Sequence, residues 1–308
     1  MIRNIPMLLR RELWEHKALY VTPVVVAGLI VFGFVASFLT MVFTGTSFKG
    51  AVAALELTGA PAGLAGGAAL IGVPFGVLNI ALAAVIFFYC IDALYAERQD
   101  KSILFWRSLP VTDTETVISK FLTAAVAAPI VTALVMVATQ CILLVLASLA
   151  ILLGSGNPVE LLLSPLPFVQ FWILFTYALL TSALWFAPVI GWFLLCSAFA
   201  KRSVLIWVVV PWLVLMMLEG IVLRGGTIAK FIGHRFSGGY ERALEVPSSL
   251  INIDLDEKEV IEMVRTGDLN IFEIIAPMKF MTSVGLWSGL LVAALFIAGA
   301  IYCRRFRS

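Results

Sequence analysis

The sequence predicts an all-α integral membrane protein with six transmembrane helices, an amino-terminal interfacial helix and a small helical extracytoplasmic segment between the fifth and sixth spans. Of its 308 residues, 61% are hydrophobic and only 13% are charged, and the mean hydropathy is +1.04. Soluble domains are about half apolar and about a quarter charged, so this chain has too few polar side chains to cover a water-soluble globule. Its apolar residues are gathered in six runs, each long enough to cross a bilayer.

The six runs occupy residues 18–43, 67–94, 121–153, 168–199, 204–223 and 281–303. A crossing takes roughly 20 residues, so the third and fourth runs should tilt, bend or project from the bilayer. Pro129 and Pro188 are the expected bending points, because a proline inside a helix removes a backbone donor.

Basic residues indicate the orientation of these spans. Thirteen Lys and Arg residues fall in the amino tail, the 95–120 loop, the turn at 201–202 and the carboxyl tail, whereas the loops 44–66 and 154–167 together hold Lys49 alone. By the positive-inside rule, both termini are predicted to be cytoplasmic. We therefore divide the chain into three parts: 1–223 with the cytoplasmic 95–120 loop, the extracytoplasmic segment 224–280, and 281–308 with the sixth span and a basic tail.

Two pieces outside the spans show helical patterning. Within residues 3–17, four apolar side chains share one helical face, which is typical of a helix lying in the membrane interface; a simple charged lead-in is the alternative. Within 224–280, acidic residues precede an apolar run that Gly267 closes, as in a short amphipathic helix. We interpret 224–280 as a small folded cap of helices.

Motifs for catalysis are missing from the sequence. It has no P-loop, HExxH or GxSxG motif, and its four cysteines are scattered singly, so we predict no catalytic residue, metal or cofactor on this chain. Ionisable residues inside spans suggest function, and Asp92 and Glu219 are the two present. Glu219 could line a translocation path or simply pair with Arg224. The candidate polar residues of such a path are Glu219, Asn79, Gln140 and Gln170; hydrogen bonding between helices is the alternative for the amides.

The loop after the second span carries the strongest signal. Charges at 97–101 precede an apolar cluster at 103–106, and a Leu-Pro-Val sequence then leads into the third span. An amphipathic helix at 97–108 would present a docking surface to a soluble partner, and Thr112 or Asp113 could cap the next helix, with Glu115 in its first turn. Ordinary membrane anchoring is the alternative. The candidate contact residues are Glu97, Arg98, Asp100, Lys101, Phe105, Trp106 and Arg107.

These features resemble the permease subunits of type 2 ATP-binding-cassette (ABC) exporters, the ABC-2 family. The motif match consists of Glu97-Arg98, then Leu109-Pro110-Val111-Thr112, then Lys120 at the entry to the third span. The layout also matches, with an interfacial amino-terminal helix, six spans and both ends inside. The outer segment 224–280 is longer than the hairpin of many members.

The resemblance implies a non-enzymatic permease that pairs with a second permease chain, a homodimer being favoured, in a bacterial inner membrane. A separate ABC ATPase would bind its cytoplasmic coupling helix and carry the ATP and Mg²⁺. Its apolar spans suit export of a hydrophobic or amphipathic substrate, and the net charge of +2 suggests no nucleic-acid partner. The alternatives are a membrane-embedded lipid-modifying enzyme that uses His234, Glu241 or Glu245, and a membrane assembly or regulatory protein.

Overall fold

The protein is described from a computed structural model. The described residues are 4–43, 62–100, 111–153, 157–159, 168–222 and 275–306, together with 230, 233–235, 238–239 and 242–244; for 62–69 only the backbone is described. The predicted amphipathic helix before Gly267 lies outside these residues, as does most of the 224–280 segment.

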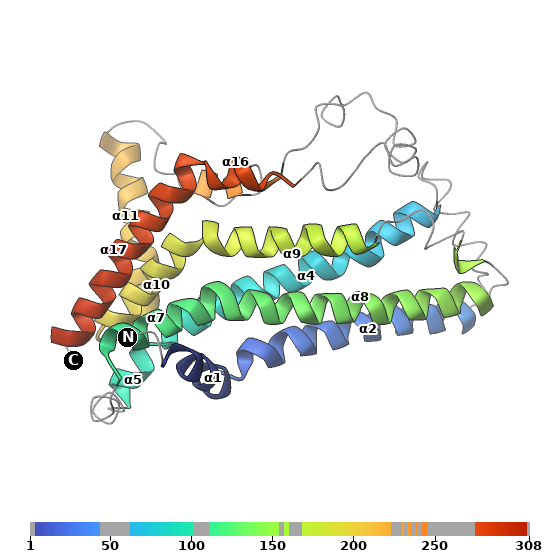
Figure 1. Cartoon of the computed structure of the whole chain (residues 1–308), viewed down its shortest axis with the longest axis horizontal. Coiled ribbons are helices and arrows are strands. Elements are labelled where there is room, and N and C mark those ends of the chain that lie inside the picture. The colour runs from blue at the N-terminus through green and yellow to red at the C-terminus, as the bar shows by residue number, and fades with distance from the viewer. Residues whose placement is uncertain are drawn as a thin grey trace.

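In the described part of the chain the architecture is helical (Figure 1), with one isolated antiparallel β-bridge between Leu244 and Ile275. The helices are α1 (Ile5–Glu15), α2 (Ala18–Phe43), α4 (Ala62–Asp92), α5 (Tyr95–Gln99), α7 (Asp113–Leu122), the π-helical turn η1 (Thr123–Ala127), α8 (Ala128–Leu153), α9 (Phe168–Trp185), α10 (Ala187–Phe199), α11 (Val204–Val222), α16 (Pro277–Met281) and α17 (Val284–Phe306).

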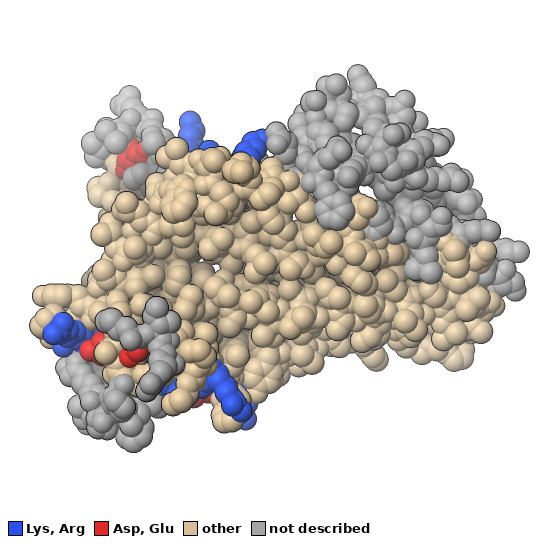
Figure 2. Space-filling model, viewed as in Figure 1, with Lys and Arg blue, Asp and Glu red and all other residues tan. Residues whose placement is uncertain are grey.

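Six of these stretches are long and apolar enough to cross a membrane, which confirms the predicted all-α membrane fold. They are Ala18–Phe43, Leu70–Gln99, Asp113–Leu153, Phe168–Trp185, Val204–Ile221 and Val284–Phe306. Figure 1 shows α2, α4, α8 and α9 running along the long axis of the molecule, with α11 and α17 inclined to them. The space-filling view shows tan, uncharged side chains over most of the visible face (Figure 2), as a surface that contacts lipid requires.

The third span begins earlier than the sequence pattern suggested. Its helix starts at Asp113 rather than near residue 121, and a capping box stabilises this amino-terminal end. The Glu115 N–H donates to Thr112 Oγ1 at 3.2 Å, and the Thr112 N–H donates to Glu115 Oε2 at 3.0 Å. Of the two predicted cap residues, Thr112 and Asp113, it is Thr112 that caps the helix. Residues 113–120 therefore belong to a helix rather than to the 95–120 loop.

Winding in this long helix changes next to Pro129. The turn η1 is π-helical, and the Ala128 N–H bonds to the carbonyl of Thr123, five residues back. Pro129 has no N–H to offer to Ala125, so a regular α-helical bond is lost here and a wider turn takes its place.

The fourth apolar run is two helices rather than one. Trp185 is the last residue of α9, Phe186 is the N-cap of α10, and α10 starts at Ala187 with Pro188 in its first turn, where the missing proline N–H is tolerated. The predicted bend at Pro188 is therefore a full break. It lets α10 turn away and pack along α17, where an added Cβ on Gly191 would lie 3.3 Å from both the Ala293 carbonyl oxygen and Phe296 Cβ.

The core sits between the long helices. Leu19 of α2, Leu78 of α4, Met136 of α8 and Leu194 of α10 all belong to one buried apolar cluster. By contrast, α11 exposes large apolar side chains along most of its length: Leu205, Ile206, Trp207, Val209, Val210, Leu213, Val214, Leu215, Met217, Leu218 and Ile221. Both ends of the chain lie at one end of the molecule (Figure 1), as an even number of crossings requires.

The α10–α17 contact predicts the effect of filling Gly191. We expect Gly191→Leu to force these helices apart and to destabilise the protein by about 1–3 kcal/mol, the usual cost of overpacking. The melting temperature in detergent measures this. Gly28→Leu is the matched control, because a Cβ at Gly28 in α2 meets nothing within 4 Å. Equal melting temperatures for the two variants would contradict the close approach of α10 and α17.

Candidate functional site

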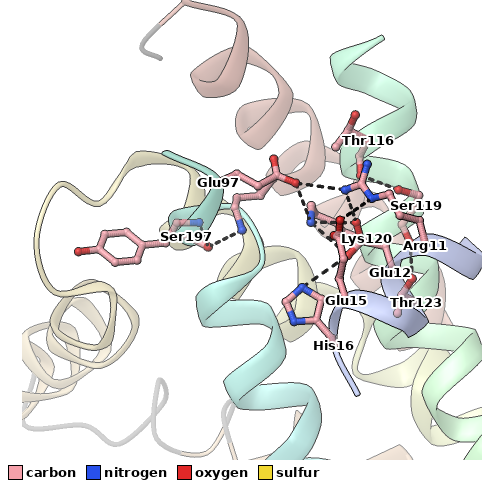
Figure 3. Close-up of polar contacts among 12 residues, drawn as sticks. Arg11, Glu12, Glu15, His16, Glu97, Thr116, Ser119, Lys120, Thr123 and Ser197 are labelled. Carbon is pink, nitrogen blue, oxygen red and sulfur yellow. Dashed lines mark hydrogen bonds and ion pairs between the residues drawn. The ribbon is translucent and has the colours of Figure 1, made fainter. Parts of the chain in front are cut away.

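A cluster of buried charges lies at the end of the molecule where α1, α5, α7 and the end of α17 meet (Figure 3). Four side chains form its centre, one from each of these helices: Glu12, Glu97, Lys120 and Arg304. Their exposed fractions are 0%, 9%, 1% and 3%. Charged side chains are almost never this buried unless they are paired, so each of the four is expected to have a partner of opposite charge.

The four residues form one continuous network of ion pairs. Lys120 Nζ lies 3.0 Å and 3.1 Å from the two carboxylate oxygens of Glu12, and 3.0 Å from Glu97 Oε1. The other oxygen of Glu97 accepts a short hydrogen bond from Arg304. Glu97 therefore bridges Lys120 and Arg304, and through them it joins α7 to α17.

Two further residues bring the network to three carboxylates and three cations. Arg304 Nε donates to Asp113 Oδ1 at 2.9 Å, and Arg11 Nη2 lies 3.0 Å from Glu12 Oε1 and 3.5 Å from Glu97 Oε1. This balance of charge is what allows the group to be desolvated, since each buried ion costs several kcal/mol unless its partners offset the loss of water.

Aromatic and imidazole groups close one side of the network. The Tyr89 hydroxyl donates to Glu12 Oε2 at 3.0 Å, and the ring of His16 packs edge-on against Tyr89 with centroids 4.8 Å apart. Burial lowers the pKa of His16, outweighing the attraction of the Glu12 carboxylate, so the imidazole is neutral at pH 7. His16 therefore adds no fourth cation to the group.

Helix α5 is held by a second set of contacts. Ser197 Oγ, near the end of α10, accepts from the Leu94 and Tyr95 N–H groups at 3.1 Å and 3.0 Å and donates to the Ile91 carbonyl at 2.7 Å. Arg98 donates to the carbonyls of Ser197 and Ala200, which are left without helical partners where α10 ends. The start of the loop is thus fixed to both α10 and the ion-pair network.

These positions change the interpretation of the predicted contact residues. Glu97 and Arg98, two of the predicted contact residues, face inward and bind other parts of this chain. Asp100 is exposed at the end of α5. Residues Lys101, Phe105, Trp106 and Arg107 lie outside the described residues, as does the part of the expected helix at 97–108 that follows Asp100; α5 itself ends at Gln99.

The candidate translocation-path residues come from four different helices: Asn79 from α4, Gln140 from α8, Gln170 from α9 and Glu219 from α11. Gln140 is 1% exposed, and its amide donates to the Ile71 carbonyl of α4 at 3.1 Å. This contact joins two helices, as the alternative reading expected. Glu219 is buried, while Asn79 and Gln170 are half-buried.

Sequence reasoning missed Glu12 entirely, used Lys120 only as a motif residue, and used Arg304 only to orient the chain. One signal was available in the amino-terminal helix. Glu12 follows Leu8 by four residues and Ile5 by seven, which places a carboxylate on the apolar face of α1. An acid on such a face predicts a buried cation nearby, but not which one.

Glu12, Glu15 and His16 also place three ligand atoms within 4.8 Å of one another. The Glu12 carboxylate already accepts from Lys120 and Tyr89, so a metal ion there would compete with the ammonium group for the same oxygens. The chemistry of this site is charge pairing between helices.

The network predicts unequal effects for two neighbouring glutamates. Glu12→Gln should destabilise the protein by about 3–5 kcal/mol, because it removes one partner of a buried ion pair. The double variant Glu12→Gln/Lys120→Met should recover much of that loss, since no unbalanced charge remains. Denaturant unfolding in detergent measures both. Glu15→Gln is the control, because its side chain is 44% exposed and its pair with Arg11 should contribute less than about 1 kcal/mol. Equal losses for Glu12→Gln and Glu15→Gln would rule the network out as a structural determinant.

The central part of the chain is similar to a known protein family. Residues 63–179 match the model of the family described as ABC-2 family transporter protein. This stretch runs from α4 through the network residues Glu97, Asp113 and Lys120 into α9. Comparison with curated proteins gave no match, and comparison with solved structures gave none. The family match agrees with the resemblance found in the sequence, and together with the six apolar helices it supports an ABC-2 type permease.

Proposed function

We propose that the chain is the transmembrane subunit of an ATP-driven exporter, and that a separate ABC ATPase binds its loop at residues 100–110. One observation carries this proposal. The loop leaves α5 just after Glu97 and enters α7 just before Asp113, and both of these acids pair with Arg304 of the last helix.

This arrangement supports a mechanical role for the loop. A force applied to residues 100–110 acts on α5 and α7 together, because the same guanidinium holds both. Through Lys120 the force reaches Glu12 of α1, and through Arg304 it reaches α17. ATP binding on the partner would move the loop, and the buried ion pairs would transmit that movement to α1 and to the third and sixth spans.

The remaining parts of the proposal follow from topology and composition. The two chain ends share one end of the molecule, and the distribution of Lys and Arg favours the cytoplasm for it. A second permease chain would complete the path, with ATP and Mg²⁺ on the ATPases and the complex in a bacterial inner membrane. The apolar character of the spans suits a hydrophobic or amphipathic substrate more than an ion.

The docking surface is tested by changing the apolar and basic part of the loop. We expect Trp106→Ala and Arg107→Glu to lower the amount of ABC ATPase that copurifies in mild detergent, because a buried aromatic anchor and a charged contact are lost. Trp287→Ala is the control for the aromatic change, since Trp287 is 57% exposed at the opposite end of α17. Glu97→Lys is unsuitable here, because it would place a third cation beside Lys120 and Arg304.

Undiminished copurification with both loop variants would remove residues 100–110 as the ATPase site. Purification of the chain without any ATPase, repeated under gentle conditions, would contradict the exporter itself and favour the enzyme or assembly alternatives.

Transmission is tested separately from docking. Arg304→Gln leaves the loop sequence intact but removes the cation that joins α17 to α5 and α7. We expect the ATPase to copurify normally while its hydrolysis is no longer stimulated by the permease. ATP hydrolysis by the purified complex measures this, with Arg305→Gln at the neighbouring position as the control. Equal stimulation in wild type and Arg304→Gln would show that the network holds the fold without transmitting motion.

A further inference from the structure

A second cluster of charge lies at the other end of α17 from Arg304. Trp185, the last residue of α9, is 1% exposed and packs with Phe280 and Leu286. Arg235 and Arg242 both approach its ring, with guanidinium carbons 4.4 Å and 6.0 Å from the ring centroid. We refer to Trp185, Arg235 and Arg242 as the Trp185 cluster.

Arg235 is held in place by three contacts. Its Nη1 donates to the Gly285 carbonyl at 2.9 Å, its own carbonyl accepts from Trp185 Nε1 at 2.8 Å, and its guanidinium covers the indole face. Its position is therefore fixed independently of any carboxylate.

Two glycines of α17 make room for this arrangement. A Cβ on Gly285 would lie 2.9 Å from the Trp185 ring, and one on Gly289 would overlap Arg235 Nη2. A spacing of two glycines four residues apart often permits two helices to approach closely. Here the same spacing accommodates an indole and a guanidinium, so this surface of α17 is shaped around a cation.

The cation has unused hydrogen-bonding capacity. Nε and Nη2 of Arg235 are buried and have no hydrogen-bond partner. The hydroxyl of Tyr177 is also buried without a hydrogen-bond partner, and Tyr177 packs against the same apolar cluster. Within the described residues, neither Arg235 nor Arg242 forms an ion pair with a carboxylate. Burial lowers the pKa of Arg235, yet a guanidinium remains charged in proteins, so among the described residues two cations approach one indole without a carboxylate partner.

We propose that the Trp185 cluster binds a phosphate-type anion on the Nε/Nη2 edge of Arg235, with Arg242 supplying the second positive charge. Nε–H and Nη2–H point the same way from the guanidinium and form the fork that phosphate oxygens accept in pairs. The third nitrogen, Nη1, is occupied by Gly285, so this fork is the part of the side chain left for a ligand. Because neither nitrogen reaches solvent, binding requires a local shift of the surrounding side chains.

The position of the cluster indicates two sources for the anion. Gly285 precedes Arg304 by nineteen residues, which is roughly 28 Å along a helix and close to the thickness of a bilayer core of about 30 Å. The cluster therefore lies at the other end of the last apolar helix from the ion-pair network. The phosphodiester of an anionic lipid is one source, and soluble phosphate is the other. This inference does not depend on the ATPase partner.

Native mass spectrometry of the full chain in detergent tests the proposal with phosphatidylglycerol and phosphatidylcholine as probes. We expect wild type to retain phosphatidylglycerol preferentially, and Arg235→Gln to lose roughly tenfold in affinity, as for a lost charged hydrogen bond. Arg235→Lys should retain only part of the affinity, because a lysine keeps the charge without the fork. Arg202→Gln is the control, an exposed arginine at the other end of the bundle.

A thermal-shift titration with inorganic phosphate, in chloride buffer without lipid, distinguishes the two sources. Stabilisation that depends on Arg235 assigns soluble phosphate, whereas selective lipid retention without that stabilisation assigns the headgroup. Should Arg235→Gln fail to fold, Arg242→Gln removes the second cation from a side chain with no hydrogen bond to the scaffold, and it should weaken the same binding. Phosphatidylglycerol and phosphate responses that are equal in wild type, Arg235→Lys and Arg242→Gln would overturn the proposal.

Discussion

The desolvation of Glu12 and Lys120 is the constraint that determines how the helices pack at the end of the molecule that holds both chain ends (Figure 1). Neither side chain is tolerated in an apolar interior without the other, and Lys120 has a further partner in Glu97. Satisfying these charges fixes α1 beneath the third span and α5 beside it. Arg304 then completes the balance and brings the end of the chain to the same place. The placement of four helices thus depends on one group of charges.

Ion pairs and hydrogen bonds between helices have a large effect on helix packing in a membrane protein. Lipid is as apolar as the side chains it surrounds, so the burial of apolar surface favours no particular pairing of helices within the membrane. Ser197 joins α10 to the end of α4, and Gln140 joins α8 to α4. Close glycine contacts, as at Gly191, supply the rest. The bundle is therefore specified by a few directional contacts within a largely uniform apolar surface.

The sequence was a good guide to the number of the spans, because a bilayer imposes its thickness directly on the length of an apolar run. It also narrowed the cap of the helix of the third span to Thr112 or Asp113, since capping chemistry is local. It could not show that Phe186 divides the fourth run, because Pro188 is compatible with either a bend or a break. Nor could it show that Glu97 faces inward, because its partners Lys120 and Arg304 lie 23 and 207 residues away.

The π-helical turn at Thr123–Ala127 has a consequence for the phase of the third span. Each residue advances an α-helix by about 100°, and a π turn accommodates one extra residue over nearly the same rise. Lys120 faces the ion pairs before the turn, and Met136 and Gln140 face the other spans after it. The chain therefore carries one more residue here than an uninterrupted α-helix would need to join the same two sets of contacts. The turn therefore lets Lys120 point toward the ion pairs while Met136 and Gln140 point toward the other spans.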